Sequence, residues 1–338
     1  MANSVAKNKK CKFGVDGNMN KLTVDAETRV LITGTSGFVG GVLAPHLSNI
    51  GYDVYCLERY VSNRYNIPTN GKLKTVFADL NDHHAIDQLV RLIQPEYVIH
   101  LAALSPVSAS YDRWQEYLTC NFTATVNLAE CCMRDDSNLK QFLFAATSEC
   151  YGNQDLAMPI KETALYYPNS PYAVSKVAAV HYLRYMREAY KFPVTLIFPF
   201  NSYGRVNCKH FITEKIIWQM LTKDVVYLGD PEPIRDLLYV TDHAEGYVSA
   251  LGNKKAVGET FNICTGKGVT IRELVDKIGK LTGFKGKVVW GSIPRRPLDI
   301  DWLVGSNTKA AEVLGWKPSV SLDDGLKQTI KMLKKEVV

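Results

Sequence analysis

The chain has 338 residues, of which 46% are hydrophobic and 22% are charged, and this composition excludes disordered and fibrous proteins. The formal net charge of +6 comes largely from lysines near both ends, and no interior run mixes basic with aromatic side chains, so we expect no nucleic-acid partner. No apolar run reaches the roughly 18 residues of a membrane span, and no Cys/His group has metal-ligand spacing. We expect a cytoplasmic protein with reduced thiols, no membrane contact and no metal site.

The hydrophobic pattern changes sharply along the chain. Residues 1–27 are polar and rich in lysine, which predicts a flexible N-terminal extension. From Arg29 on, "RVLITGTSGFVG" and "GVLAPHLSNIGY" predict a strand, a tight turn and a helix closed by Gly51. Helical stretches then alternate with further runs of strand length, namely "DVYCLER", "LKTVFADL", "YVIHLAAL", "LKQFLFAATSE" and "VTLIFPF". This alternation predicts an α/β fold, a Rossmann-type doubly wound parallel sheet.

After "VTLIFPF" the alternation loosens into Pro- and Gly-rich segments, which predicts a smaller C-terminal lobe that binds the substrate. We expect residues 28–205 to form the Rossmann domain, and 206–235 together with 266–338 to form the lobe. "ETFNICTG" has the pattern of a strand, so residues 236–265 are expected to return to the main sheet. The active site would then lie in the crevice between the two parts.

The segment "TGTSGFVG" places Gly34, Gly37 and Gly40 directly after the first strand and at the start of a helix. Gly34 would permit the tight turn, Gly37 would let the backbone approach a pyrophosphate, and Gly40 would allow close packing of the helix. The free N–H groups of the helix N-terminus would face the phosphates. The domain 28–205 is therefore predicted to bind NAD(P), with further loop contacts from Thr35, Phe38 and Val39.

Residues at later strand ends would complete the cofactor site. Glu58 closes the second strand, about 20 residues downstream of the glycines, where a carboxylate binds a ribose hydroxyl and favours NAD. Arg59 beside it could accept a 2′-phosphate, which leaves NADP as an alternative. The adenine and the middle of the dinucleotide would lie at later strand ends, and the expected contacts there are Asp79 and Leu80 in "FADL" and Leu101, Ala102 and Ala103 directly after His100.

A tyrosine and a lysine in "PNSPYAVSKVAAVHYLRYMREAY" form the candidate catalytic pair. Ser170 has the character of a helix N-cap and Pro171 of the first turn, so Tyr172 and Lys176, four residues apart, would share one helix face. A phenol is a poor base at neutral pH, but an adjacent ammonium and the positive nicotinamide ring would favour its phenolate. Such a group could take a hydroxyl proton while a hydride leaves the same carbon.

Taken together, "TGxxGxxG", "ATSECYG" and "YAVSK" resemble the extended short-chain dehydrogenase/reductase family of nucleotide-sugar epimerases and dehydratases, from about Arg29 to nearly the C-terminus. The resemblance implies a nucleotide-diphosphate sugar as substrate and a cofactor contact from Pro199. "RDLLYVTDHAEGY" is similar to a family segment with a phosphate-binding arginine, here Arg235. "RRPLDIDWLVGSNTKAAEVLGWKP" is similar to a later motif that implies diphosphate and ribose contacts from Arg296 and Asp299.

The triplet Thr147, Ser148 and Glu149 resembles the one found in sugar 4,6-dehydratases. Once C4 of the sugar is a ketone, the C5 proton is acidified, and a carboxylate within reach can remove it while a second group protonates the departing C6 hydroxyl. We assign Thr147 to the C4 oxygen, Tyr172 to its deprotonation, and Lys176 to tuning Tyr172 and holding the ribose. Glu149 would be the C5 base and Ser148 would assist the loss of water.

"PIKETALYYPNSPYAVSK" and "HFITEK" further resemble GDP-mannose 4,6-dehydratases, which implies substrate contacts from Lys215, Asn201 and Ser105. The base and the hexose stay open. The alternatives to a dehydratase are a nucleotide-sugar 4-epimerase, a UDP-glucuronate decarboxylase, and a non-catalytic dinucleotide sensor, against which the intact Tyr172 and Lys176 argue. The family also commonly pairs through two long helices, so a homodimer is expected.

Overall fold

The computed structural model describes residues 28–59, 73–134, 136–154, 158–206 and 211–337. The expected flexible extension, residues 1–27, lies outside this part of the chain. No helix in the described ranges is long and apolar enough to cross a membrane, and no group of three His, Cys, Asp or Glu side chains there could hold a metal ion. The described cysteines are free thiols.

A seven-stranded parallel sheet forms the centre of the larger part, so the doubly wound Rossmann-type fold is confirmed. Its strands, in spatial order, are β10 (Thr260–Ile263), β6 (Val194–Pro199), β5 (Gln141–Ala145), β4 (Tyr97–His100), β1 (Arg29–Thr33), β2 (Asp53–Glu58) and β3 (Leu73–Phe77). The order reverses at β1 and β4. Their carboxyl ends therefore open the crevice in which such sheets bind ligands.

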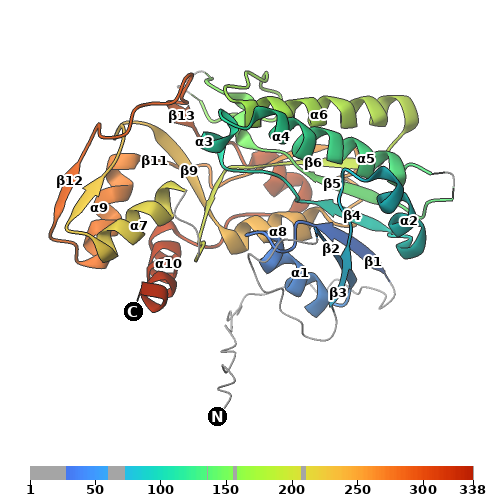
Figure 1. Cartoon of the computed structure of the whole chain (residues 1–338), viewed down its shortest axis with the longest axis horizontal. Coiled ribbons are helices and arrows are strands. Elements are labelled where there is room, and N and C mark those ends of the chain that lie inside the picture. Colours follow the sequence, from blue (N-terminus) through green and yellow to red (C-terminus); the bar gives the residue numbers. More distant parts are fainter. Residues whose placement is uncertain (1–27, 60–72, 135, 155–157, 207–210, 338) are drawn as a thin grey trace, which may run out of the picture.

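Helices cover both faces of this sheet (Figure 1). On one face lie α2 (His83–Ile93), α5 (Ala124–Cys132) and α6 (Pro171–Tyr190), and on the other lie α1 (Gly40–Asn49) and α8 (Val240–Ala250). The strands serve both layers because their side chains alternate: Leu31 packs with the first set, and Val30 and Ile32 with the second. Both faces are buried, as the apolar runs in the sequence predict.

Short helical segments cross the carboxyl edge of the sheet. After β4 come α3 (Val107–Ser110), α4 (Trp114–Leu118) and a π-helical turn, η1 (Thr119–Thr123), which leads into α5. After β5 comes a 3₁₀ turn, η2 (Ser148–Tyr151). Helix α6 begins as its sequence predicts, because Ser170 is the N-cap, its side chain accepts from the Ala173 N–H, and Pro171 occupies the first turn.

Within the described residues, the smaller lobe combines two short sheets with helices (Figure 1). Strand β9 (Ile234–Tyr239) pairs with β11 (Gly268–Thr270), β13 (Trp302–Leu303) and β7 (Asn201–Tyr203), and β8 (Val225–Tyr227) pairs with β12 (Lys287–Val289). The helices are α7 (Ile212–Thr222), α9 (Ile271–Thr282), which a Thr270–Glu273 capping box opens, and α10 (Leu322–Val337).

The chain passes between the two parts more often than the expected boundaries allow. β10 joins the edge of the main sheet beside β6, but β9, which includes residues 236–239 of the expected return, lies in the second sheet. A π-helical turn, η3 (Ala310–Leu314), packs Ala310 into the core beneath the main sheet, although it lies in the range expected for the lobe. The division into two lobes at these boundaries therefore stays a proposal.

The glycines that open α1 predict a stability difference between two neighbouring substitutions. A Cβ on Gly40 would lie 2.3 Å from the Gly34 carbonyl oxygen, whereas one on Gly41 would lie 3.7 Å from the Thr35 oxygen, an ordinary contact. Gly40→Ala should therefore lower the free energy of unfolding by about 1–3 kcal/mol. Gly41→Ala should raise it by about 0.5–1 kcal/mol, because alanine favours a helix. Urea unfolding of both variants tests this, and equal effects would contradict the packing described.

Candidate active site

The fold brings Thr147 and Tyr172 together at the carboxyl end of β5. Thr147 caps the turn η2, where its Oγ1 accepts a hydrogen bond from the Glu149 N–H at 3.3 Å, and Tyr172 stands in the first turn of α6. Burial raises the pKa of the Tyr172 phenol, and a side-chain hydrogen bond with Thr147 opposes that shift. Burial therefore disfavours the phenolate form of Tyr172, which a positive charge nearby would favour.

Lys176 joins α6 to the end of β5. Its Nζ donates to the Ala145 carbonyl oxygen at 2.7 Å and lies 4.7 Å from the centre of the Phe144 ring. Only 2% of the residue is exposed, and burial lowers the pKa of the ammonium to about 8. A lysine with this pKa can exchange a proton near neutral pH, as expected of the residue predicted to tune Tyr172.

Glu149 is buried with one oxygen unused. The residue is 7% exposed, and its Oε2 has no hydrogen-bond partner among the described residues. Burial raises the pKa of the carboxyl, while the charges of Arg296 and Arg235 oppose the shift. A buried carboxyl with a raised pKa and a free oxygen has the properties of a general base for a proton on carbon.

The two arginines and Asp299 form the wall beside Glu149. Arg235, on β9, donates from Nη2 to the Ile300 carbonyl oxygen at 2.7 Å and lies 3.8 Å from Asp299 Oδ1. Arg296 donates to the same Asp299 oxygen at 2.5 Å. The structure thus brings together three residues expected to contact the substrate and the candidate base. Guanidinium groups here could bind the oxygens of a diphosphate.

The remaining expected substrate contacts make no hydrogen bond to this cluster among the described residues. Asn201, at the start of β7, has a buried Oδ1 with no partner in the described ranges, as expected of an atom that bonds to a ligand. Ser105 is exposed on the loop before α3, and Lys215 lies half-buried on α7. No side-chain hydrogen bond links Ser105 or Lys215 to the cluster within the described part, so their roles stay predictions.

The glycine-rich turn has the shape of a phosphate cradle. Gly34 has φ +76°, and a Cβ there would lie 2.8 Å from the Ala102 N atom. A Cβ on Gly37 would lie 3.0 Å from the Gly34 oxygen, so the loop closes tightly ahead of α1. Thr35, Phe38 and Val39 belong to this loop. The bare backbone and the start of α1 fit a pyrophosphate.

Glu58 lies at the carboxyl end of β2, as predicted, and is bonded to the glycine loop. Its Oε1 accepts hydrogen bonds from the Thr35 hydroxyl and, at 2.6 Å, from the Ser36 N–H. The sequence could not indicate this second task, because both donors belong to a turn 22 or 23 residues earlier. Glu58 therefore fixes the loop as well as standing where a ribose hydroxyl is expected.

The other expected cofactor residues line the same edge. Arg59 and Asp79 are exposed at the ends of β2 and β3, and both act electrostatically on the Cys120 thiol, which places them near one another. The other expected contacts also lie at or just beyond the carboxyl ends of their strands, namely Leu80, Leu101, Ala102, Ala103 and Pro199. His100 is different: its ring bonds to Thr33 and Thr125, and burial lowers its pKa to about 3, so it is a neutral core residue.

Two supporting residues went unnoticed in the sequence. Asn121, within η1, accepts from the Leu104 N–H at 2.8 Å and donates to the Leu104 carbonyl and to Ser175, next to Lys176. Tyr111 donates at 3.0 Å to the carbonyls of Asn169 and Pro297, joining the start of α6 to the segment of Arg296. The only sequence signal for Asn121 is that a polar side chain lies inside an apolar helical stretch.

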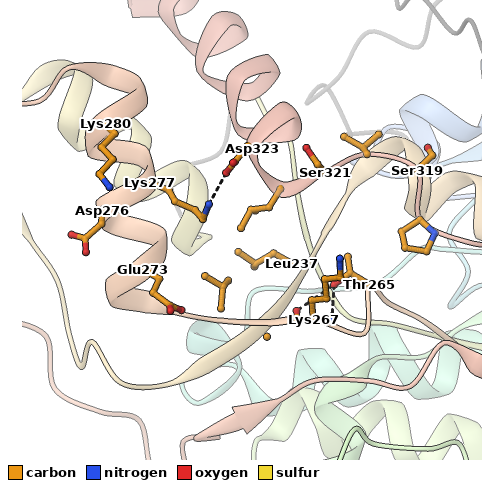
Figure 2. Close-up of a pocket in the computed structure, with 15 residues that line it drawn as sticks. Leu237, Thr265, Lys267, Glu273, Asp276, Lys277, Lys280, Ser319, Ser321 and Asp323 are labelled. Carbon is orange, nitrogen blue, oxygen red and sulfur yellow. Dashed lines mark hydrogen bonds and ion pairs between the residues drawn. The ribbon is translucent and has the colours of Figure 1, made fainter.

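Two cavities differ in their relation to this cluster. One of about 450 Å³, lined by Tyr111, Trp114, Pro171 and Leu298 among others, borders the start of α6 at Pro171, the residue before Tyr172. Another of about 800 Å³ lies in the second lobe between α9 and residues 318–323, where Lys277 pairs with Asp323 (Figure 2). No residue expected in the site lines the larger cavity, so its size does not mark it as the catalytic centre.

Comparison with known proteins agrees with this geometry. The family model described as GDP-mannose 4,6 dehydratase matches residues 31–329. The chain belongs to this family. It is thereby one of the extended short-chain dehydrogenase/reductases that act as nucleotide-sugar epimerases and dehydratases, and hence an enzyme of that group.

Its relatives have more than one activity. The chain is 30% identical to the UDP-glucose 4-epimerase of Mycolicibacterium smegmatis, over 90% of this chain and 98% of the relative. It is 29% identical to the dTDP-glucose 4,6-dehydratase of Haemophilus influenzae, over 89% and 96%. A UDP-glucuronic acid 4-epimerase from Bacillus cereus, solved with UDP-glucuronic acid and NAD, is 26% identical with a TM-score of 0.82, over 91% of this chain and 99% of that one.

The lowered pKa of Lys176 predicts how stability depends on pH. The pKa is about 8 in the folded protein and 10.5 in an ordinary lysine, so between these values the unfolded chain binds more protons. Relative to Lys176→Met, the wild-type free energy of unfolding should therefore rise across this window, by on the order of 3 kcal/mol. Urea unfolding of both proteins at several pH values measures it. A difference that does not change with pH would show that Lys176 titrates normally.

Proposed function

We propose that this protein is a nucleotide-sugar 4,6-dehydratase that converts an NDP-hexose, similar to GDP-mannose, into the 4-keto-6-deoxy sugar. The observation that carries the proposal is Glu149: a buried carboxyl with a raised pKa and an unused oxygen, two residues beyond Thr147. A 4-epimerase only oxidises and reduces C4, so it needs no carboxylate to take a proton from C5. An elimination does need one.

We propose NAD as the cofactor, since Glu58 stands where a free 2′-hydroxyl would bind and would repel a 2′-phosphate. The Bacillus cereus structure, solved with NAD, supports this choice. Arg59 keeps NADP as the alternative. When bound, the nicotinamide supplies a temporary acceptor for the hydride of C4, which returns to C6 at the end of the reaction. The protein's own residues carry out the proton transfers.

Tyr172 would remove the proton of the C4 hydroxyl while Thr147 donates a hydrogen bond to the C4 oxygen. Lys176 lies one helical turn further along α6, where its ammonium would stabilise the Tyr172 phenolate and hold the ribose. Glu149 would then take the C5 proton, and Ser148 would help to protonate the C6 hydroxyl as it leaves as water. Arg235, Arg296 and Asp299 would hold the diphosphate and ribose, with Asn201, Lys215 and Ser105 around them.

The second candidate function is nucleotide-sugar 4-epimerase, because a relative of that activity is 30% identical and Thr147, Tyr172 and Lys176 serve it equally well. A UDP-glucuronate decarboxylase, which also exploits a C4 ketone, stays open beside it. We further propose a cytoplasmic homodimer. Exposed Trp114, Val174, Tyr185 and Tyr190 on α4 and α6 support the pairing of these helices.

Two substitutions separate the oxidation from the elimination. Glu149→Gln keeps the shape of the site but removes the base, so reduced nicotinamide should still form on mixing with substrate, while dehydrated product should fall by roughly 10²- to 10⁴-fold. Tyr172→Phe should prevent the reduced nicotinamide from forming at all, because the C4 proton has no acceptor. Stopped-flow absorbance and product mass measure the two steps.

Glu162→Gln is the matched control. Glu162 accepts a hydrogen bond from the Asn262 N–H at 2.9 Å and has no place in the proposed proton transfers, so this variant should dehydrate at close to the wild-type rate. Release of dehydrated product by Glu149→Gln at the wild-type rate would remove the main support for a dehydratase and favour the epimerase.

A further inference from the structure

Arg205 lies outside the proposed catalytic set, and its guanidinium is held between two aromatic rings. The guanidinium carbon is 4.1 Å from the centre of the Phe38 ring and 3.7 Å from the centre of the Phe211 ring. Its side chain is 11% exposed. Arginine suits this place because its planar, permanently charged group can stack on a ring with each face.

Polar contacts fix the same guanidinium from the side. Arg205 donates to the Ser202 carbonyl oxygen and lies 3.6 Å from Glu214 Oε1, a carboxylate on α7 that is almost fully buried. That oxygen also accepts the backbone N–H groups of Gly204 and Arg205, each at 2.9 Å. The side chain of Arg205 is therefore held in a defined position.

The two rings belong to different parts of the molecule. Phe38 lies in the glycine-rich loop between Gly37 and Gly40, and it packs against the core of the second lobe. Phe211 is the N-cap of α7, the helix that carries Lys215. Arg205 thus connects the loop expected to hold the dinucleotide with the helix expected to contact the nucleotide sugar.

We propose that Arg205 is a positioning residue that couples the binding of the dinucleotide to the binding of the nucleotide sugar. The inference rests on the proposed function, in that both ligands must bind. A dinucleotide that orders the glycine loop fixes Phe38, and through Arg205 it fixes the start of α7. The nucleotide sugar then binds to a helix that is already ordered. Because coupling between two binding sites is reciprocal, the bound nucleotide sugar in turn increases the affinity for the dinucleotide.

The coupling can be measured without turnover. NADH is titrated by fluorescence into the whole protein, alone and with saturating UDP or GDP, whichever the wild type binds. In the wild type the nucleotide should lower the NADH dissociation constant by about fivefold or more. In Arg205→Met, which keeps the apolar stem but loses the stacking cation, the ratio of the two constants should fall to about one.

Two further variants and one control distinguish coupling from a general structural effect. Arg205→Lys keeps the charge but not the planar group that stacks, so it should give an intermediate ratio of the two dissociation constants. Phe38→Leu removes the ring that the glycine-rich loop supplies to Arg205, so it should also lower this ratio. Arg184→Met removes an arginine that stacks on Tyr166 at 5.2 Å in the Rossmann domain, and it should keep the wild-type ratio. Loss of stability alone would change melting temperatures without changing these ratios.

A wild-type ratio of one, or a ratio in Arg205→Met equal to that of the wild type, would overturn the inference and leave the proposed function intact. If Arg205→Met does not fold, the ratios of Arg205→Lys and Phe38→Leu decide in the same way. A wild type that binds neither NADH nor either nucleotide would overturn the proposed function itself, and the coupling with it.

Discussion

The hydrogen bond from the Lys176 ammonium to the Ala145 carbonyl is the contact on which the candidate active site depends, because it fastens α6 to the end of β5. Thr147 follows that carbonyl by two residues, and Tyr172 precedes Lys176 by one helical turn. Once the two elements are joined, Thr147 and Tyr172 must meet. Asn121 holds α6 at a second point, because it bonds to Ser175 and to the backbone of Leu104 in the loop after β4.

The same region shows how burial gives ordinary side chains unusual properties. Burial lowers the pKa of Lys176 to about 8 and raises the pKa values of Tyr172 and Glu149, since each charged form loses hydration. Glu149 is kept from a larger shift by Arg296 and Arg235. Buried charges persist only where others balance them, and here two guanidinium groups lie beside two carboxylates. A diphosphate bound to these two guanidinium groups would change the balance of charge around Glu149. Substrate binding would thereby affect the protonation of Glu149.

Much of the fold and of the candidate site could be predicted from the sequence, because the residues that encode these features lie close together in the chain. The glycine turn, the capped start of α6 and the Tyr172–Lys176 pair are encoded by residues close together, and the alternation of strands and helices fixes the doubly wound sheet. Contacts between segments far apart in the chain could not be predicted. They include the hydrogen bond of Glu58 to Ser36, the hydrogen bonds of the His100 ring to two threonines, and the stacking of Arg205 between Phe38 and Phe211. The placement of β9 in the second sheet could not be predicted, because nothing within "IRDLLY" indicates which strands it pairs with.

The proposed dehydration requires that a proton leaves C5 of the sugar, and the fate of that proton can be measured. The purified protein is incubated in deuterated water with a panel of GDP-, dTDP-, CDP- and UDP-hexoses, and the products are followed by mass and by NMR. We expect one substrate to lose the mass of water and to gain deuterium at C5, because the proton taken by Glu149 is replaced from solvent. A product of unchanged mass with no deuterium at C5 would contradict it and identify an epimerase.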